Sequence, residues 1–390
     1  MFSGAAELRA VMVCPEAPFP MIGGGPLRTA SLVHYLARRY VLDVIVFREP
    51  GGPDPRAAFP AGLVRRVSVV DLPANRRDTV SRVARNVARW VRQVPPHEDR
   101  FRGFTLPLDG RYHLALVEHF WCSSYVDQLQ AVCESVVLDL HNIESHFYER
   151  RAEVAGGAFA RVLAGFGEQN RRLEAERLPR FDAVLTTSAA DAARIEHPRK
   201  IVYPNAIPER PQPARGDEPV VAFSGNMEFP PNLTAIEWFR DAVWPVVVER
   251  HPEARWRLIG KNPAAAERLL RGVGNVQIAG AVEDAVAELA RCRLAVVPLR
   301  SGSGTRLKII EAWAAGTPVV STTIGAEGLA GQAGQHLEIA DRPEEFIEAI
   351  CRLFSDSSHA ERVGAAGRRL FECEYTWPVA WSALTLRLGR

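Results

Sequence analysis

The stretch Leu294–Ser321, "LAVVPLRSGSGTRLKIIEAWAAGTPVVS", contains the pattern that decides the fold class. It begins with a short apolar run, passes through a Ser-Gly-Ser-Gly loop, continues as an apolar helix and ends on a second apolar run. Gly316 and the proline two residues later are typical of a helix that stops and leads into a new strand. A strand, a helix and another strand in this order predict one unit of a parallel sheet.

The same alternation of short apolar runs and amphipathic helices continues along the chain. Runs of β-branched residues bounded by turns suit a parallel sheet covered on both faces. The expected strands are Leu8–Cys14, Val41–Phe47, His113–Val117, Ser135–Leu140, Ala183–Thr187, Val220–Ser224, Arg255–Ile259, Val276–Ile278, Leu294–Pro298 and Pro318–Ser321. A proline-rich stretch without periodicity, residues 205–218, indicates a linker between the fifth and sixth strands.

The pattern on both sides of this linker predicts an α/β protein with two Rossmann-like, doubly wound domains that face each other across a cleft. We expect residues 1–205 to form the first domain and residues 206–370 the second. Residues 371–390 are expected to be helical and to pack back toward the first domain. Ligands of open α/β sheets bind outside the carboxyl ends of the strands, so the loops that follow strands are the candidate sites.

Composition excludes several classes of protein. The 390 residues carry a formal net charge of +2, which gives no general attraction for nucleic acid. The six cysteines are scattered and have no metal-ligand spacing, which favours reduced thiols over disulfides or zinc. The N-terminus lacks a signal-peptide pattern and no run approaches 18 apolar residues. These features predict a cytoplasmic protein.

Two cations and an acid stand out at the start of the helix in the opening stretch. Arg306 and Lys308 lie at the expected helix start near Thr305, where a lone cation opposes the helix dipole by about a few tenths of a kcal/mol. An anion at this place, most simply a diphosphate, would explain them. Glu311, one turn later, could accept hydrogen bonds from the hydroxyls of a ribose. The alternative is a Lys308–Glu311 pair on a solvated helix face.

The loop after the first strand holds three consecutive glycines before a helix. Backbone N–H groups of such a loop can approach an anion, so Gly24 and Gly25 are candidate ligand-binding residues. A dinucleotide-binding fingerprint does not fit, because Arg28 stands where the third glycine would be. The alternative is a flexible loop in front of a helix that starts with proline.

Three stretches together resemble the nucleotide-sugar glycosyltransferases of family 4, which have the GT-B fold. They are "FSGNMEFPPNLTAIEWF" at residues 223–239, "VYPNAIP" at 202–208 and "GTRLKIIEAWAAGTPVVST" at 304–322. The resemblance covers most of the chain and is most specific over residues 220–330. It implies transfer of a sugar from a nucleotide diphosphate donor to an acceptor hydroxyl, with retention of configuration and no metal requirement. Such enzymes act in polysaccharide, glycolipid or glycoconjugate synthesis.

The resemblance also implies roles for residues of the second domain. Glu311 would hold the donor ribose, and Arg306 and Lys308 would face the diphosphate as catalytic groups. Gly280 and Val282 would lie beside the nucleobase. The remaining donor-binding candidates are loop residues, namely Gly225, Ser303, Gly304 and Thr305.

Two histidines follow strands of the first domain. His141 matches the family's histidine near the donor sugar, which implies a catalytic role. Without that match, a structural hydrogen bond would be the usual explanation for a histidine at such a place. His119 in "VEHFW" also lies at a strand exit, and there we expect a packing role.

Two departures from the family pattern support other functions. Ser303 stands eight positions before Glu311, where the family often has a second glutamate, and Asn226 stands where an arginine is frequent. The alternatives are therefore a catalytically inactive subunit that binds nucleotide sugars, or a GT-B-fold nucleotide-sugar epimerase.

A basic amphipathic helix is expected near residues 76–94. Its arginines at 3, 4, 3 spacing share one face, and valines cover another; the arginines are Arg82, Arg85, Arg89 and Arg92. Such a helix can lie on an anionic membrane, which would give peripheral contact with the inner face of the membrane and a lipid-linked acceptor. The alternative is an ordinary surface helix with solvated charges.

Overall fold

The computed structural model describes residues 8–74, 78–302 and 306–388. The chain forms two compact units, one of Met1–Pro204 with Ala383–Arg390 and one of Asn205–Ser382. For comparison, the sequence analysis placed the division between residues 205 and 206. Among the described helices, none has the length and apolar character needed to cross a membrane.

The first unit contains a parallel sheet of seven strands in the order β3-β2-β1-β4-β5-β6-β7. The strands are β1 Arg9–Cys14, β2 Val41–Arg48, β3 Arg66–Asp71, β4 Tyr112–Glu118, β5 Cys133–Asp139, β6 Ala183–Thr186 and β7 Lys200–Val202. The strand order reverses between β1 and β4, and the loops that leave those two strands therefore diverge at a topological switch point.

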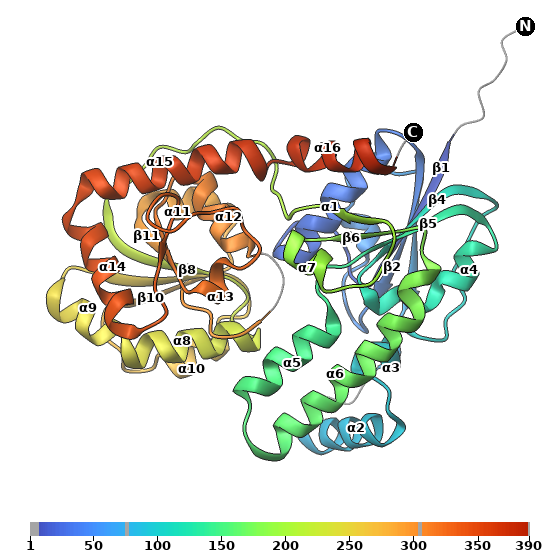
Figure 1. The fold of residues 1–390 in the computed structure, drawn as a ribbon, viewed down its shortest axis with the longest axis horizontal. Coiled ribbons are helices and arrows are strands. Elements are labelled where there is room, and N and C mark those ends of the chain that lie inside the picture. Colours follow the sequence, from blue (N-terminus) through green and yellow to red (C-terminus); the bar gives the residue numbers. More distant parts are fainter. Residues whose placement is uncertain (1–7, 75–77, 303–305, 389–390) are drawn as a thin grey trace, which may run out of the picture. The chain divides into compact units, whose positions relative to one another are not determined.

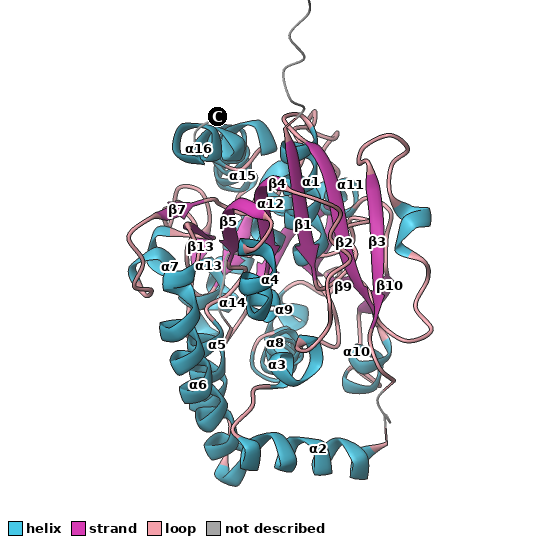
Figure 2. Ribbon diagram, turned by 90° about the vertical axis from the view of Figure 1, so that its right-hand side faces the viewer, coloured by secondary structure: helices cyan, strands magenta, loops and turns pink. Residues whose placement is uncertain are grey.

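Helices lie on both faces of this sheet, as Figure 1 shows. The helices of this unit are α1 Gly24–Ala37, α2 Thr79–Arg92, α3 Pro96–Phe101, α4 Val126–Gln130, α5 Glu144–Val154, α6 Gly157–Arg177 and α7 Ala189–Ala193, of which α2 lies away from the sheet. The central strands are buried on both sides, which explains their near-continuous apolar sequences. Helices α5 and α6 form a hairpin that extends away from the sheet, with α2 beside its far end (Figures 1 and 2).

The second unit contains a parallel sheet of six strands in the order β10-β9-β8-β11-β12-β13. The strands are β8 Glu218–Ser224, β9 Arg255–Ile259, β10 Val276–Gly280, β11 Cys292–Val297, β12 Val319–Ser321 and β13 Glu338–Ile339. The helices are α8 Pro230–Ala242, α9 Trp244–Arg250, α10 Ala264–Leu269, α11 Ala285–Arg291, α12 Leu307–Ala314, α13 Thr323–Ala326, α14 Pro343–Ser355, α15 Ser357–Glu374 and α16 Trp377–Leu388. Both units are doubly wound, as the sequence predicts.

Helix α12 is held in the second unit by close packing against α15. The indole of Trp313 is fully buried and donates from Nε1 to the carbonyl of His336 at 2.8 Å. A Cβ atom added to Gly367 of α15 would collide with this indole. The absent side chain at Gly367 therefore lets α15 approach α12 closely, which fixes the position of the α12 amino end.

Three edge strands were not expected from the sequence. Strands β3, β7 and β13 lie at sheet edges. The residues of β3 are at most partly buried, and β7 and β13 have only three and two residues, so all three lack the apolar runs that mark the central strands. Helix α12 begins at Leu307, slightly later than the expected start near Thr305. Gly316 follows its end with φ of +69°, the left-handed conformation expected of a glycine that ends a helix.

Candidate functional site

The first turn of α12 presents Lys308 to the carboxyl end of β8. The Lys308 Nζ donates to Asn232 Oδ1 at 2.8 Å and lies 4.2 Å from the centroid of the Phe223 ring. Lys308 and Glu311 attract each other, but both are half-buried and each also interacts with a residue of another element, Asn232 or Ser224. The alternative of a pair on a solvated face is therefore wrong, because this face lies against β8 and α8.

Glu311 lies one turn deeper and is hydrogen-bonded by the buried hydroxyl of Ser224. Burial raises the pKa of Glu311 to about 7, although Lys308 and the Ser224 hydroxyl oppose this shift. The Ser224 hydroxyl helps to hold the Glu311 side chain in place. Because this side chain is only half-buried, it still reaches solvent. A carboxylate in this setting can accept hydrogen bonds from paired hydroxyls of a ligand.

The environment of Lys308 disfavours its own charge. Burial lowers the pKa of Lys308 to about 7, and the nearby positive charge of Arg306 acts in the same direction. Two cations at a helix amino end repel each other and oppose the helix dipole. An anionic ligand at this place would reverse both effects, which is the electrostatic signature expected of an anion site.

Loops from neighbouring strands meet at the same edge of the second sheet. Gly225 follows β8 with φ of +147°, and a Cβ atom there would lie 2.8 Å from Asn232 Nδ2 and 3.2 Å from Lys308 Nζ. Gly280 ends β10, and Val282, which follows it, is half-buried. The structure thus brings Gly225, Gly280 and α12 to the carboxyl edge of one sheet. The predicted residues Ser303, Gly304 and Thr305 lie outside the described residues.

The first unit holds a buried network of charged side chains at the carboxyl ends of β4 and β5. The Arg28 guanidinium donates to both carboxylate oxygens of Asp139, at 2.7 and 2.5 Å. His141 Nε2 lies 2.6 Å from Glu118 Oε2 and 3.2 Å from Asp139 Oδ2. The hydroxyl of Thr29 donates to Glu118 at 2.9 Å. Residues from α1, β4 and β5 are thereby joined in one network.

The carboxylates of this network favour the positively charged form of His141. Burial alone would lower the pKa of His141, but the carboxylates of Glu118 and Asp139 outweigh it and raise the pKa to about 9. Two acids therefore fix the orientation of the His141 ring, as they would for a histidine with a purely structural role. The form of the ring that they favour carries a charge next to the end of β5. Three of these side chains could in principle share a metal ion, since the ligand atoms of Glu118, Asp139 and His141 lie within 4.8 Å of one another. Arg28 already engages both oxygens of Asp139.

His119 is the residue whose environment the sequence did not reveal. It has φ of +59°, a strained conformation for a residue other than glycine, and it is buried. Among the residues that the structure describes, neither ring nitrogen has a hydrogen-bond partner. The ring centroid lies 3.5 Å from that of His141, and burial together with the charge of His141 lowers the pKa of His119. The ring also stacks on that of Trp121 with the centroids 4.7 Å apart, which agrees with the predicted packing role, whereas its unsatisfied nitrogens are unusual for a buried side chain.

The glycine loop lies next to this pair of histidines. Helix α1 begins at Gly24, after Gly23 with φ of +97°. A Cβ atom at Gly25 would collide with a carboxylate oxygen of Glu16 and lie 3.8 Å from His119 Nε2. The loop therefore brings the amino end of α1 and a carboxylate to the strand exits that carry His119 and His141.

The match to a known family lies within the second unit, whereas a curated relative matches most of the chain. Residues 218–356, within the second unit, match the family described as Glycosyl transferases group 1. The D-inositol 3-phosphate glycosyltransferase of Rhodococcus opacus is 26% identical over 378 residues, which cover 88% of this chain and 80% of that protein. The second unit therefore carries a glycosyltransferase domain of this family. The match confirms the resemblance seen in the sequence to nucleotide-sugar glycosyltransferases.

Solved structures show the same architecture for the glycosyltransferase as a whole. Sucrose-phosphate synthase from Thermosynechococcus elongatus has a TM-score of 0.71 at 17% identity, covering 97% of this chain and 98% of the other. HepE of Anabaena, solved in complex with UDP and glucose, has a TM-score of 0.63 at 15% identity, with 97% and 98% coverage. At these identities the likeness concerns the fold alone.

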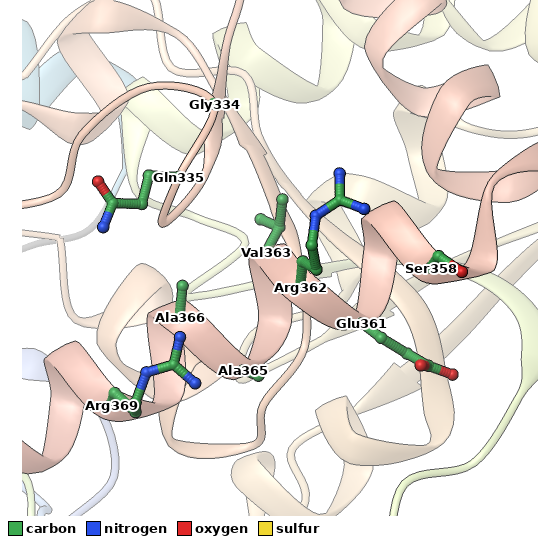
Figure 3. A pocket seen from close by; sticks show the side chains of 9 residues that line it. All are labelled: Gly334, Gln335, Ser358, Glu361, Arg362, Val363, Ala365, Ala366 and Arg369. Atoms are coloured by element: carbon green, nitrogen blue, oxygen red, sulfur yellow. The ribbon is translucent and has the colours of Figure 1, made fainter.

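An open hollow of the glycosyltransferase lies elsewhere in the second unit. It has a volume of 630 Å³ and is open to solvent along α15 (Figure 3). Its lining consists of Gly334, Gln335, Ser358, Glu361, Arg362, Val363, Ala365, Ala366 and Arg369. None of the residues predicted from the sequence is in this lining, so we place the candidate site at the α12 amino end.

The arginines of helix α2 of the glycosyltransferase do not form one solvated face. Arg89 and Arg92 donate to the carboxylate of Asp99, at 2.8 and 3.1 Å, and Arg85 is half-buried. The side chain of Arg82 lies outside the described residues. Arg85 and Arg89 therefore do not belong to a solvent-exposed arginine face. The ion pairs with Asp99 of α3 hold that side of the helix against the rest of the unit.

Proposed function

We propose that this glycosyltransferase moves a sugar from a nucleotide diphosphate donor to an acceptor hydroxyl with retention of configuration. The observation that carries the proposal is the arrangement at the α12 amino end, where Lys308 and Glu311 are held by Asn232 and Ser224. The solved complex of HepE with UDP and glucose, which has the same fold, supports a nucleotide-bound donor. The similar D-inositol 3-phosphate glycosyltransferase of Rhodococcus opacus supports transfer of a glycosyl group to an acceptor.

The proposed roles follow from charge. Lys308 and Arg306 face the donor diphosphate, and Glu311 accepts hydrogen bonds from the ribose. Gly225, Gly280 and Val282 line the nucleoside. During transfer, negative charge grows on the leaving diphosphate, and preorganised cations stabilise it; removal of one such group typically lowers the rate about 10²–10³-fold. Because these cations supply the charge, we also propose that the reaction needs no metal, which activity in excess EDTA would test.

The first unit is proposed to act on the sugar and the acceptor. His141, charged and fixed by Glu118 and Asp139, would contact the donor sugar. Gly24 and Gly25 would let the backbone approach the same ligand. His119, with both ring nitrogens unsatisfied, is a candidate to bind an acceptor hydroxyl. The acceptor class we favour is a growing polysaccharide or a lipid-linked glycan.

Nucleotide release with and without an acceptor separates this proposal from its alternatives. UDP- and GDP-sugars are incubated with the protein and a panel of glycan and glycolipid acceptors. Release that depends on the acceptor supports transfer. Asn226 and Ser303 favour the inactive-subunit alternative, which predicts tight binding without turnover. Conversion of the donor sugar without any acceptor would indicate an epimerase.

A further inference from the structure

Helix α2 turns an apolar face to solvent. Four valines at 3, 4, 4 spacing, here called the valine row, are Val80, Val83, Val87 and Val91. Their exposed fractions are 79%, 55%, 55% and 68%, and the neighbouring Trp90 is 49% exposed. Ala84 and Ala88, between the valines, are exposed as well. A helix on the surface of a water-soluble domain normally has the opposite orientation, with its apolar stripe facing the core.

Specific contacts hold the helix in this orientation. The Arg89 side chain is only 12% exposed and forms an ion pair with Asp99 of α3. Asp78 caps the amino end by accepting from the Ser81 backbone N–H at 2.8 Å. On α6, a Cβ atom at Gly165 would lie 3.2 Å from Trp90 Nε1, so the indole already packs closely against that glycine. The polar side is thus engaged, and the valine row is left outward.

Exposed apolar side chains also occur on the elements next to α2. Val154 and Phe159, at the turn between α5 and α6, are 55% and 56% exposed. Helix α2 contacts α6, and both views show α2 and this turn at the same end of the unit (Figures 1 and 2). Several large apolar side chains are thus exposed at one end of the unit, which is more than the scattered single cases common on protein surfaces.

Cations outnumber acids around these apolar side chains, with Asp99 pairing Arg89 and Arg92 and Glu153 exposed next to Val154. Helix α2 contains four arginines and no acidic residue in its sequence TVSRVARNVARWVR. Arg92, at its end, is 57% exposed, and Arg161 of α6 is exposed too. An apolar row bordered by cations complements an anionic lipid surface, where acyl chains meet negatively charged head groups.

We propose that the valine row inserts into the interfacial layer of an anionic bilayer, with Val154 and Phe159 beside it and arginines at the lipid phosphates. The apolar row makes the contact, and the arginines mainly orient the helix and add attraction. This surface is separate from the proposed sugar-transfer site, so lipid binding can be measured whether or not the transfer proposal holds.

Vesicle sedimentation tests the proposal with the full chain. The vesicles are pure phosphatidylcholine or phosphatidylcholine with about 30% phosphatidylglycerol, matching the dependence on anionic lipid expected for such helices. The variants are wild type, the triple variant Val83→Ser, Val87→Ser and Val91→Ser, and the control Leu8→Ser, which removes an exposed apolar side chain from a distant surface. We expect wild type and control to bind anionic vesicles equally, and the triple variant at least about tenfold more weakly.

The outcomes are distinguishable. Equal sedimentation of wild type and triple variant, or no binding of wild type to anionic vesicles, would overturn the proposal. So would a wild-type dimer that the triple variant dissociates without any change in lipid binding, since the row would then join two copies of the chain. If the triple variant fails to fold by circular dichroism, the single variant Val87→Glu replaces it. Unchanged nucleotide binding by the variants shows that the transfer site is intact.

Discussion

At the scale of single residues, the candidate site depends on two side chains whose charges the protein itself disfavours. Burial moves the pKa of Lys308 down and that of Glu311 up, both to about 7. The protein holds them near neutrality until a ligand favours their charged forms. This gives the site a pH dependence whose sign follows from the chemistry of the ligand.

We expect the affinity for a nucleotide diphosphate sugar to be greatest near pH 7. A bound diphosphate raises the pKa of Lys308, so binding takes up a proton and affinity falls above pH 7, at most about tenfold per pH unit. Ribose hydroxyls stabilise ionised Glu311 and lower its pKa, so affinity rises as the pH approaches 7 from below. Titration calorimetry of Lys308→Met should show weaker binding that keeps only the rising limb; a falling limb in that variant would contradict the role of Lys308.

A second residue-scale prediction concerns stability. Arg28 and Asp139 form a fully buried ion pair, and removal of one partner from such a pair costs about 3–5 kcal/mol because the other charge stays buried. Arg28→Met should therefore lower the free energy of unfolding of the first unit by about this amount in urea. Arg48→Met, which breaks the exposed pair with Asp71, should lower it by less than about 1 kcal/mol. Similar losses in both variants would contradict the assigned importance of the buried pair.

The sequence predicted Lys308 and Glu311 because they lie on one helix turn next to a distinctive loop. It could not predict their partners Asn232 and Ser224, which come from α8 and β8 and meet α12 only in the folded unit. Similarly, His119 has no distinguishing pattern in the sequence. Its positive φ and its unsatisfied nitrogens arise from the way β4 ends beside β5.

At the scale of elements, the central strands and the helices between them could be predicted because burial on both faces leaves long apolar runs. Edge strands such as β3 and β13 could not, since one side of each is exposed or their runs are short. The orientation of α2 was also beyond the sequence. Periodicity shows that a helix has two faces, but the contact of Arg89 with Asp99 decides which of them turns inward.

Packing of α12 against α15 gives an element-scale prediction. Gly367→Ala places a methyl group against the Trp313 indole, and overpacking of this kind typically costs about 1–3 kcal/mol. Because Trp313 belongs to the helix that carries Lys308 and Glu311, nucleotide affinity should fall together with stability. Glu361→Ala on the exposed side of α15 should change stability by less than about 0.5 kcal/mol. Unaltered thermal unfolding and nucleotide affinity in Gly367→Ala would show that this packing does not position α12.

At the scale of the whole molecule, the two doubly wound units were predictable from the interruption of the strand–helix pattern at the proline-rich linker. The end of the chain is more complex than a separate helical segment. Helix α16 begins within the second unit, while Ala383–Arg390 belong to the first. There, the hydroxyl of Thr385 accepts a hydrogen bond at 3.1 Å from Arg39, which follows the end of α1.

A nucleotide that binds the folded chain should stabilise it. At 100 times its dissociation constant, a ligand adds about 2.7 kcal/mol to the apparent free energy of unfolding. A thermal-shift screen of uridine and guanosine diphosphates and their sugar conjugates should therefore identify the donor class by the largest rise in midpoint. The absence of any shift across nucleotides at millimolar concentration would argue against a nucleotide-dependent enzyme.

The central claim is that Glu311 and the cations of the α12 amino end bind the nucleotide diphosphate of the donor. Isothermal titration calorimetry of the donor identified in the screen, on wild type, Glu311→Ala and the exposed control Glu348→Ala, tests it most directly. We predict at least about 100-fold weaker binding for Glu311→Ala, since hydrogen bonds to a charged group contribute about 1.5–3 kcal/mol each, and wild-type affinity for the control. Equal affinities for all three proteins would contradict the claim.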